Sequence, residues 1–391
     1  MKASSCFIST PVLPFLAILL LQAFPTPEIS LDPNAGWVPF EQHLGTYILF
    51  EVEVGDQTTI ALLDSGASLT TFDAAFARSI KLPVQFKGKA IGIGGEQEMQ
   101  VCGPVALEFG PIRIKNLTIA ALDLSAIQAG LGKKVDVILG REIFKALAVE
   151  IDYPHRRIRF HGADSKSIDT PFEFTKLVLE GSLLHVECEI ENGPKVLAAL
   201  DTGAGGVIHV FAPYVKKHKM LKGRKLSTAM ASGIGGDLLI PQATLSHIKL
   251  CGQTFTQLPA SLHDIAMGAF DNTKGSANLG GGLFREFHVL IDLPKNRFGI
   301  VPRKEPVAFL RNRSGLQFKT VDDAFQVRYV APNSPAAKEN WMVGDRIVKI
   351  NGKLVNSTVD SWKWSSEAAG TKVVLTLASG VERVLVLADY F

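Results

Sequence analysis

The stretch ALLDSGAS at residues 61–68 returns as AALDTGAG at residues 198–205, so that Asp201 follows Asp64 by 137 residues. In both copies an apolar run, typical of a buried strand, ends on an Asp-[Ser/Thr]-Gly triplet. A carboxylate at the end of such a strand lies at the rim of an apolar interior, where an isolated charge is costly. Each aspartate therefore needs a partner, and the other copy of the stretch can supply it.

Two further blocks repeat in the same order. GIGGE at residues 92–96 returns as GIGGD at 233–237, and the LGREIF segment from Leu139 returns as LGGGLF from Leu279, with offsets of 141 and 140 residues. Three blocks at nearly one offset predict two copies of one lobe, over residues 35–162 and 170–303. The pattern within each copy is mostly strand, and the polar stretch HGADSKSIDT joins the two.

Composition bounds the remaining possibilities. The chain has 391 residues, 47% of them hydrophobic, which is enough for two or three domains. Its net charge of +3 is nearly neutral, and it has no long basic block with interleaved aromatic residues, so nucleic acid is not an expected partner. Cys102, Cys188 and Cys251 allow one disulfide at most, and Cys188 alternates with glutamates as a buried strand residue does.

The first 24 residues, MKASSCFISTPVLPFLAILLLQAF, combine Lys2 with a short apolar core. That length suits a secretory signal peptide better than a membrane span. The sequence therefore predicts a signal peptide over residues 1–24 and a secreted or periplasmic protein. No clean cleavage motif follows, so an uncleaved membrane anchor remains the alternative.

The two glycine loops do not fit a dinucleotide-binding motif, because Gln97 and Leu238 stand where GxGxxG requires glycine. Glycine permits positive φ and leaves a hairpin tip unobstructed beside a ligand. We therefore expect two movable hairpin tips, with ordinary surface turns as the alternative. The expected tips are Gly92, Ile93, Gly94 and Gly95 in the first copy and Gly233, Ile234, Gly235 and Gly236 in the second.

These features together resemble the aspartic peptidases, and the retroviral type more than the pepsin type. The resemblance covers about residues 40–303 and implies a mainly β fold of two retropepsin-like lobes related by a pseudo-twofold axis. It implies Asp64 and Asp201 as a catalytic dyad that shares one proton, with the glycine loops as flaps over a bound peptide. No metal or organic cofactor is implied. The residues expected to support the two active-site loops are Ser65, Gly66, Thr202 and Gly203.

The sequence departs from this family pattern at several positions. Asn278 stands where the first copy has Ile138, and Gly205 where it has Ser68. Both triplets are followed by alanine, so we expect the hydroxyl donor that pepsin-like enzymes direct at the catalytic carboxylates to be missing from both halves. Such a donor favours the charged form. We therefore expect activity from mildly acidic to near-neutral pH.

The last segment, residues 312–391, resembles a PDZ domain of the kind attached to secreted and periplasmic proteases, through GLQF at 315–318 and GDRIVKING at 344–352. The resemblance implies an α+β domain that binds peptide C-termini as an added strand. Arg311 or Arg313 could supply a countercharge, and solvated linker arginines are the alternative. The implied carboxylate-binding loop comprises Gly315, Leu316, Gln317 and Phe318.

Other protease classes fit poorly. The chain has no GDSGG, and His43, the only histidine before Ser65, is too close to it in sequence for a trypsin-like triad. The metallopeptidase motif HExxH is absent. We expect a single-chain aspartic endopeptidase that cleaves peptides or proteins. The alternative is a secreted peptide-binding protein with a catalytically inert peptidase-like groove.

Overall fold

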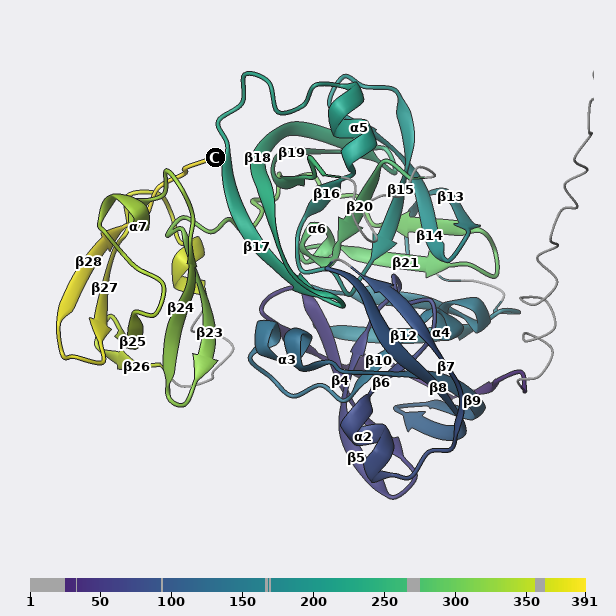
Figure 1. Ribbon diagram of the computed structural model, residues 1–391. Helices are drawn as coiled ribbons and strands as arrows, with labels where there is room; N and C mark the ends of the chain where they lie inside the picture. The colour runs from purple at the N-terminus through teal and green to yellow at the C-terminus, as the bar shows by residue number, and fades with distance from the viewer. Residues whose placement is uncertain are drawn as a thin grey trace, which may run out of the picture.

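The computed structural model describes residues 25–32, 34–92, 94–165, 168, 170–265, 275–355 and 363–391. The molecule is mainly β: a purple-to-blue lobe and a teal-to-green lobe face each other, and a smaller yellow-green domain lies beside the second (Figure 1). The predicted signal peptide lies outside the described residues. Within the described part of the chain, no helix is both long and apolar enough to cross a membrane.

The first lobe is built on a nine-stranded sheet of order β1-β9-β6-β10-β5-β4-β8-β7, with β3 paired to β4. In β4, Val52 and Val54 are buried and the alternating Glu51 and Glu53 are exposed, as a strand with one face on the core requires. Gly55, at φ +60°, then turns the chain into β5. The strands are β1 (Glu28–Leu31), β3 (Glu41–His43), β4 (Tyr47–Val54), β5 (Gln57–Leu63), β6 (Thr71–Asp73), β7 (Val84–Gly92), β8 (Gly95–Phe109), β9 (Ile112–Leu122) and β10 (Val137–Leu139).

Three short helices connect these strands: α2 (Ala74–Ser79), α3 (Ser125–Leu131) and α4 (Arg141–Ala146). Asp73 caps α2 by accepting hydrogen bonds from the N–H groups of Ala75 and Phe76. Strand β1 precedes residue 35, where the sequence analysis places the start of the lobe, and it pairs antiparallel with β9.

The second lobe repeats the strand order of the first. Its path β17-β18-β19-β16-β20-β15-β14 corresponds to β7-β8-β9-β6-β10-β5-β4. In both lobes the strand leading to the aspartate lies parallel to the strand that ends in Leu-Gly. The elements are β13 (Glu173–Glu180), β14 (Leu183–Ile190), β15 (Lys195–Asp201), β16 (Ile208–Val210), α5 (Ala212–Lys217), β17 (Ser227–Gly233), β18 (Gly236–Leu250), β19 (Gln253–Leu262), β20 (Ala277–Gly280) and α6 (Gly281–Phe284).

A sheet beneath the two lobes joins them through β2 (Val38–Pro39), β11 (Leu147–Asp152), β12 (Arg157–Gly162), β21 (His288–Asp292) and β22 (Arg297–Ile300). Strands β11 and β21, one from each lobe, pair antiparallel with Val149 opposite Ile291. Glu150 on β11 is buried and accepts hydrogen bonds from His161 and His288. Its burial raises the pKa, but these hydrogen bonds outweigh that effect and hold the pKa below its usual range.

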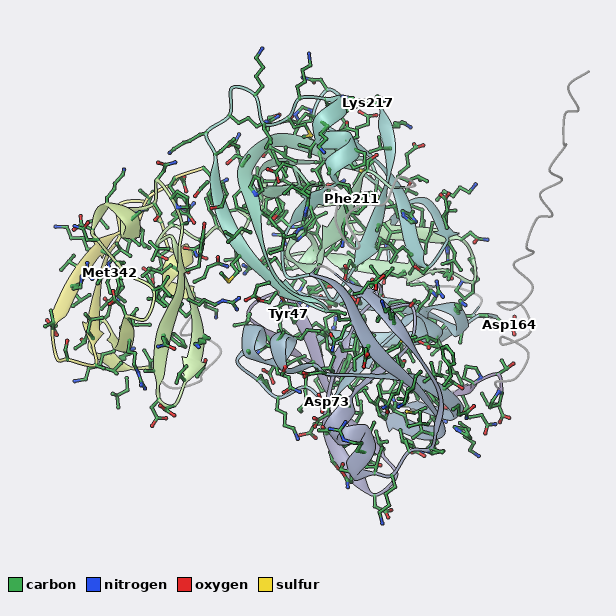
Figure 2. The ribbon with its side chains drawn as sticks, in the orientation of Figure 1. Tyr47, Asp73, Asp164, Phe211, Lys217 and Met342 are labelled. Atoms are coloured by element: carbon green, nitrogen blue, oxygen red, sulfur yellow. The ribbon has the colours of Figure 1, made fainter. Side chains whose placement is uncertain are left out.

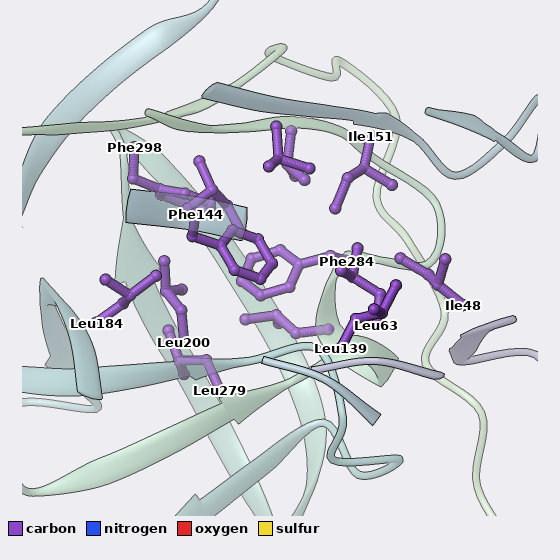
Figure 3. Close-up of a cluster of buried hydrophobic side chains, with 14 of the residues drawn as sticks. Ile48, Leu63, Leu139, Phe144, Ile151, Leu184, Leu200, Leu279, Phe284 and Phe298 are labelled. Atoms are coloured by element: carbon purple, nitrogen blue, oxygen red, sulfur yellow. The ribbon is translucent and has the colours of Figure 1, made fainter. Parts of the chain in front are cut away.

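One apolar core runs through both lobes. Leu63 and Leu139 of the first lobe belong to it together with Leu200 and Leu279 of the second, at the ends of the strands that carry the aspartates and the Leu-Gly pairs (Figure 3). Cys188 is buried in β14, which confirms its predicted place in a strand, and Cys102 and Cys251 are also buried free thiols. The two lobes therefore share a single hydrophobic interior, which fixes their loops relative to each other.

The third domain has its own sheet, of order β23-β24-β25-β27-β28 with β26 paired to β25, and its own apolar core around Trp341 and Trp364. Strand β23 lies at the edge of this sheet. The elements are β23 (Leu316–Val321), β24 (Ala324–Val330), α7 (Pro335–Lys338), β25 (Arg346–Ile350), β26 (Lys353–Leu354), the 3₁₀ helix η2 (Lys363–Ser366), β27 (Lys372–Leu377) and β28 (Glu382–Val386).

Candidate active site

The two repeated aspartates meet where the lobes join. Asp64 follows β5 and Asp201 ends β15, and their carboxyl groups hydrogen-bond to each other. Each triplet glycine packs against the opposite aspartate: a side chain at Gly66 would come within 2.7 Å of the carboxyl carbon of Asp201, and one at Gly203 would collide with the carboxyl group of Asp64. Glycine is therefore required at both positions for the carboxyl groups to approach.

The hydroxyl groups of Ser65 and Thr202 tie the two loops together. Ser65 Oγ donates to the carbonyl of Leu200 at 2.9 Å and accepts from the N–H of Thr202 at 3.0 Å. Thr202 Oγ1 donates to the carbonyl of Leu63 at 2.9 Å and accepts from the N–H of Ser65 at 3.0 Å. Both hydroxyl groups are buried, so these four bonds hold the aspartates in fixed register across the lobe boundary.

The electrostatic environment of Asp64 favours its protonated form. Burial is the largest cause, the charge of Asp201 adds to it, and together they raise the pKa of Asp64 well above its usual range. The N–H groups of Gly66 and Ala67 oppose this rise by donating to Oδ1 of Asp64, at 2.7 and 3.2 Å. The pair thus holds one proton to higher pH than an exposed carboxyl group does.

Asn278, on β20, donates from its side-chain nitrogen to Oδ2 of Asp201 at 2.6 Å. Ala67 and Ala204 leave both halves without the hydroxyl donor, but in the second lobe Asn278 supplies a different side-chain donor to the aspartate. This donor does not come from the loop positions Ala67 and Ala204 but from a different strand, β20, which pairs in parallel with β15. The apolar Ile138 occupies the matching register position in the first lobe and cannot donate.

Tyr47, at the start of β4, is a site residue that the sequence analysis missed. It lies where the two lobes meet (Figure 2), and its phenol group packs against Gly205. Burial, followed by the charges of Asp201 and Asp64, raises the pKa of Tyr47 to about 12, so the hydroxyl stays a neutral donor. A side chain at Gly205 would collide with this hydroxyl, which explains why Gly205 replaces the Ser68 of the first copy.

The two glycine hairpins touch each other at their tips. Strands β7 and β8 end the first hairpin with Gly92 opposite Gly95, and β17 and β18 end the second with Gly233 opposite Gly236. The N–H of Gly94 donates to the carbonyl of Ile234 at 2.9 Å, and a side chain at Gly94 would collide with the backbone of Gly235. The predicted tip residue Ile93 lies outside the described residues.

The side chains that flank the dyad differ between the lobes. The first lobe supplies an apolar cluster that includes Leu49 and Ile138, against which Ile234 of the second hairpin packs. The second lobe places His185 and His209 in the corresponding region, and burial lowers the pKa of both. Among the described residues, no group of three or more His, Cys, Asp or Glu side chains is arranged to hold a metal ion.

The predicted carboxylate-binding loop of the third domain faces the second lobe. The side-chain amide of Gln317 donates to the carbonyl of Met230 on β17 at 2.9 Å and accepts from its N–H at 2.7 Å. Arg328 on β24 donates to Ser232 at 2.9 Å, near the tip of the same hairpin. The N–H of Leu316 donates to Ser314 at 3.0 Å, so one predicted carboxylate donor has an internal partner.

The arginines before that loop are not solvated linker residues. Arg311 is buried and donates to Thr244 at 2.8 Å, and Arg313 forms an ion pair with Asp389 at 2.7 Å. Neither arginine is therefore free to supply a countercharge to a peptide carboxylate.

Two family models match the chain. Residues 50–143 match a model described as aspartyl protease, and residues 314–385 match a model of the PDZ domain. The chain therefore carries an aspartyl protease domain and, after it, a PDZ domain. The first match covers one lobe, with Asp64, and ends before Asp201. No curated protein matches the chain.

Proposed function

We propose that this protein is an aspartic endopeptidase in which Asp64 and Asp201 act together on a water molecule. The observation that carries the proposal is the direct contact of the two carboxyl groups across the lobe boundary, fixed by the buried bonds of Ser65 and Thr202. Like charges this close do not both ionise, so the pair carries one proton over a wide pH range. The match to the aspartyl protease model over residues 50–143 supports the same class.

A singly protonated pair can supply both proton transfers that peptide hydrolysis needs. The ionised carboxylate takes a proton from water as the water oxygen bonds to the scissile carbonyl carbon, and the protonated carboxyl group gives its proton to the carbonyl oxygen. The tetrahedral intermediate then breaks its C–N bond. A proton moves to the leaving nitrogen, and the dyad returns to its singly protonated state.

The hairpins and the flanking side chains fit a peptide substrate. Gly94 and Gly235 meet at the hairpin tips, and we propose that the joined tips cover the dyad, so that a peptide held between them would be screened from bulk water. The apolar cluster around Leu49 and Ile138 offers a surface for apolar side chains of the substrate on the first-lobe side. Tyr47 adds a neutral hydroxyl beside both carboxyl groups.

The test is a peptide-cleavage assay with and without a pepstatin-type transition-state analogue. Such analogues bind more tightly than substrates where a site is complementary to the transition state, which here requires both carboxyl groups. We expect cleavage that the analogue abolishes. A folded protein that binds peptides without cleaving them would support the alternative, a peptide-binding protein with an inert groove.

We further propose that the PDZ domain recruits substrates with free C-termini, because a peptide can add as a strand to the open edge of β23. The substrates would then be proteins held near the active site by their tails. We also propose that the protein acts outside the cytoplasm, on the strength of residues 1–24 alone. Cell fractionation with N-terminal sequencing of the recovered protein tests this, and recovery from the cytoplasmic fraction alone, with residue 1 intact, would contradict it.

A further inference from the structure

The donors to the two carboxyl groups of the dyad are distributed unequally. Both donors to Asp64, the N–H groups of Gly66 and Ala67, are directed at Oδ1. Among the described residues, no N–H or O–H group donates to Oδ2 of Asp64. Asp201 instead accepts a hydrogen bond at each oxygen. The N–H of Gly203 donates to Oδ1 at 3.0 Å, and the side-chain nitrogen of Asn278 donates to Oδ2 at 2.6 Å.

A proton is more favourable on the carboxyl oxygen that accepts fewer hydrogen bonds, because donors stabilise the ionised form. Oδ2 of Asp64 meets this condition, whereas both oxygens of Asp201 are occupied by donors that favour the carboxylate form. The side chain that creates this difference is Asn278, because Ile138 stands at its register position beside Asp64.

We infer that Asn278 is a positioning residue that keeps the shared proton of the dyad on Asp64 by donating its side-chain N–H to Oδ2 of Asp201. The inference rests on the proposed function and assigns its two roles: Asp201 is the base toward water, and Asp64 is the acid toward the carbonyl oxygen. Asn278 takes the place of the hydroxyl that Ala204 lacks, and reaches the carboxylate from β20 instead of from the loop itself.

Other titratable groups face Asp201 and must be separated from this effect. They are Asp64 after β5, Tyr47 at the start of β4 and His209 on β16. Tyr47 stays neutral because burial and the two carboxylates raise its pKa to about 12. Burial lowers the pKa of His209, which favours its neutral form.

The central experiment replaces Asn278 with the residue of the other lobe, Asn278→Ile, and records kcat/KM against pH. Without the donor the singly charged dyad is less favourable and takes up its second proton at higher pH. We expect the acid limb to move upward by about 1 pH unit. Asn278→Ala serves as a second variant if isoleucine prevents folding, and the melting temperature of each variant checks the fold.

Two further variants separate positioning from packing. Ala204→Ser in the Asn278→Ile background offers a new hydroxyl donor to the same carboxylate and should return the acid limb toward the wild-type position. His209→Thr, which installs the residue found at the matching register position Thr71, should leave the acid limb in place because the donor remains. A purely structural role for Asn278 predicts loss of kcat without a moved limb and without rescue by Ala204→Ser.

A second readout does not depend on turnover. The ¹³Cγ signals of the aspartates, followed by NMR against pH in wild type and Asn278→Ile, report protonation of the dyad directly. The inference is overturned if the first protonation step of the dyad does not move upward in the variant. A shift of that step to lower pH would also overturn the inference, because it would mean that the amide oxygen of Asn278 accepts a hydrogen bond from a protonated Asp201. If the wild type cleaves no peptide but these signals behave as expected, the proposed function fails and the assignment of the proton stands.

Discussion

At the residue scale, the dyad is asymmetric although the triplets around it repeat. Asp64 is held by backbone donors alone, and burial together with Asp201 raises its pKa. Asp201 has a side-chain donor in Asn278. Because a proton with a raised pKa is lost only at higher pH, the alkaline limb of activity should extend toward neutral pH.

Ala67→Ser tests this account of the alkaline limb. A hydroxyl at this position can donate to the carboxylate of Asp64, favours its charged form and lowers its pKa. We expect the alkaline limb of kcat/KM to move to lower pH by about 1 unit. A hydrogen bond to a charged group contributes about 1.5 to 3 kcal/mol, and relaxation of the site reduces that contribution. Ala204→Ser in the otherwise unchanged protein should move it less, because Oδ2 of Asp201 already accepts from Asn278. An unmoved limb in Ala67→Ser contradicts the account.

Tyr47→Phe tests the role of the phenol hydroxyl. The change removes a neutral hydrogen-bonding group beside the dyad. We expect kcat/KM to fall by about 2- to 10-fold, the equivalent of a bond worth 0.5 to 1.5 kcal/mol. Gly205→Ser, which places a side chain against Tyr47, should be more destabilising in thermal unfolding. If Tyr47→Phe matches wild type in kcat/KM, the hydroxyl has no part in the site.

Neither Asn278 nor Tyr47 could be assigned from the sequence, although each left a trace there. Asn278 was visible as a polar residue where the repeat has Ile138, and Gly205 as a lost side chain where it has Ser68. The contacts that explain them cross between strands far apart in sequence. Local patterns carry no information on such contacts, whereas Asp64 and Asp201 are marked by the repeat itself.

At the element scale, the strand order of the two lobes follows from the repeat, because corresponding apolar runs bury the same faces. The contact between the two hairpin tips could not be predicted, since glycine patterns fix neither the curvature of a hairpin nor the place where its tip lies. The pairing of β1 with β9 was also missed, because the four residues of β1 show no strong strand pattern.

Gly94→Val and Gly235→Val test the hairpins. Either side chain would collide with the backbone of the opposite tip, and a β-branched residue also restricts the local backbone. We expect kcat/KM to fall by more than 10-fold while the melting temperature changes by only a few degrees, because closure over the substrate is what the change disturbs. Gly223→Val, in a turn with open space around it, is the control for a general cost of valine at a glycine with positive φ. Equal losses of stability and activity would show that these hairpins are ordinary surface turns.

At the scale of the whole molecule, the PDZ domain packs against β17, the outer strand of the second hairpin. The domain itself could be predicted from GLQF and GDRIVKING, but its place beside the hairpin could not. Gln317 illustrates this: its backbone belongs to the predicted carboxylate-binding loop, while its side chain completes the edge of the peptidase sheet at Met230.

A chain truncated near Val301 tests the division of labour between the domains. We expect it to cleave a short unstructured peptide with kcat/KM reduced by about 10-fold or less, because the bonds of Gln317 to Met230 are lost. It should lose more efficiency on a protein with a free C-terminal tail. Gln317→Leu in the full-length chain removes only those two bonds and keeps those of Arg328 and Arg311, so it should lower kcat/KM on the short peptide less than the truncation does and should keep the efficiency on a protein with a free C-terminal tail. A folded truncated chain that is inert toward every peptide would show that the PDZ domain completes the active site.

The most direct measurement of the central claim is turnover by Asp64→Asn and Asp201→Asn, each compared with wild type on one peptide at the wild-type pH optimum. Each change keeps the size of the side chain and removes one carboxyl group. The mechanism needs both groups, because one donates a proton while the other accepts one. The account predicts that kcat/KM falls by at least about 100-fold in each variant, with the melting temperature close to or above that of the wild type. Substantial turnover by either folded variant would contradict the two-carboxyl mechanism.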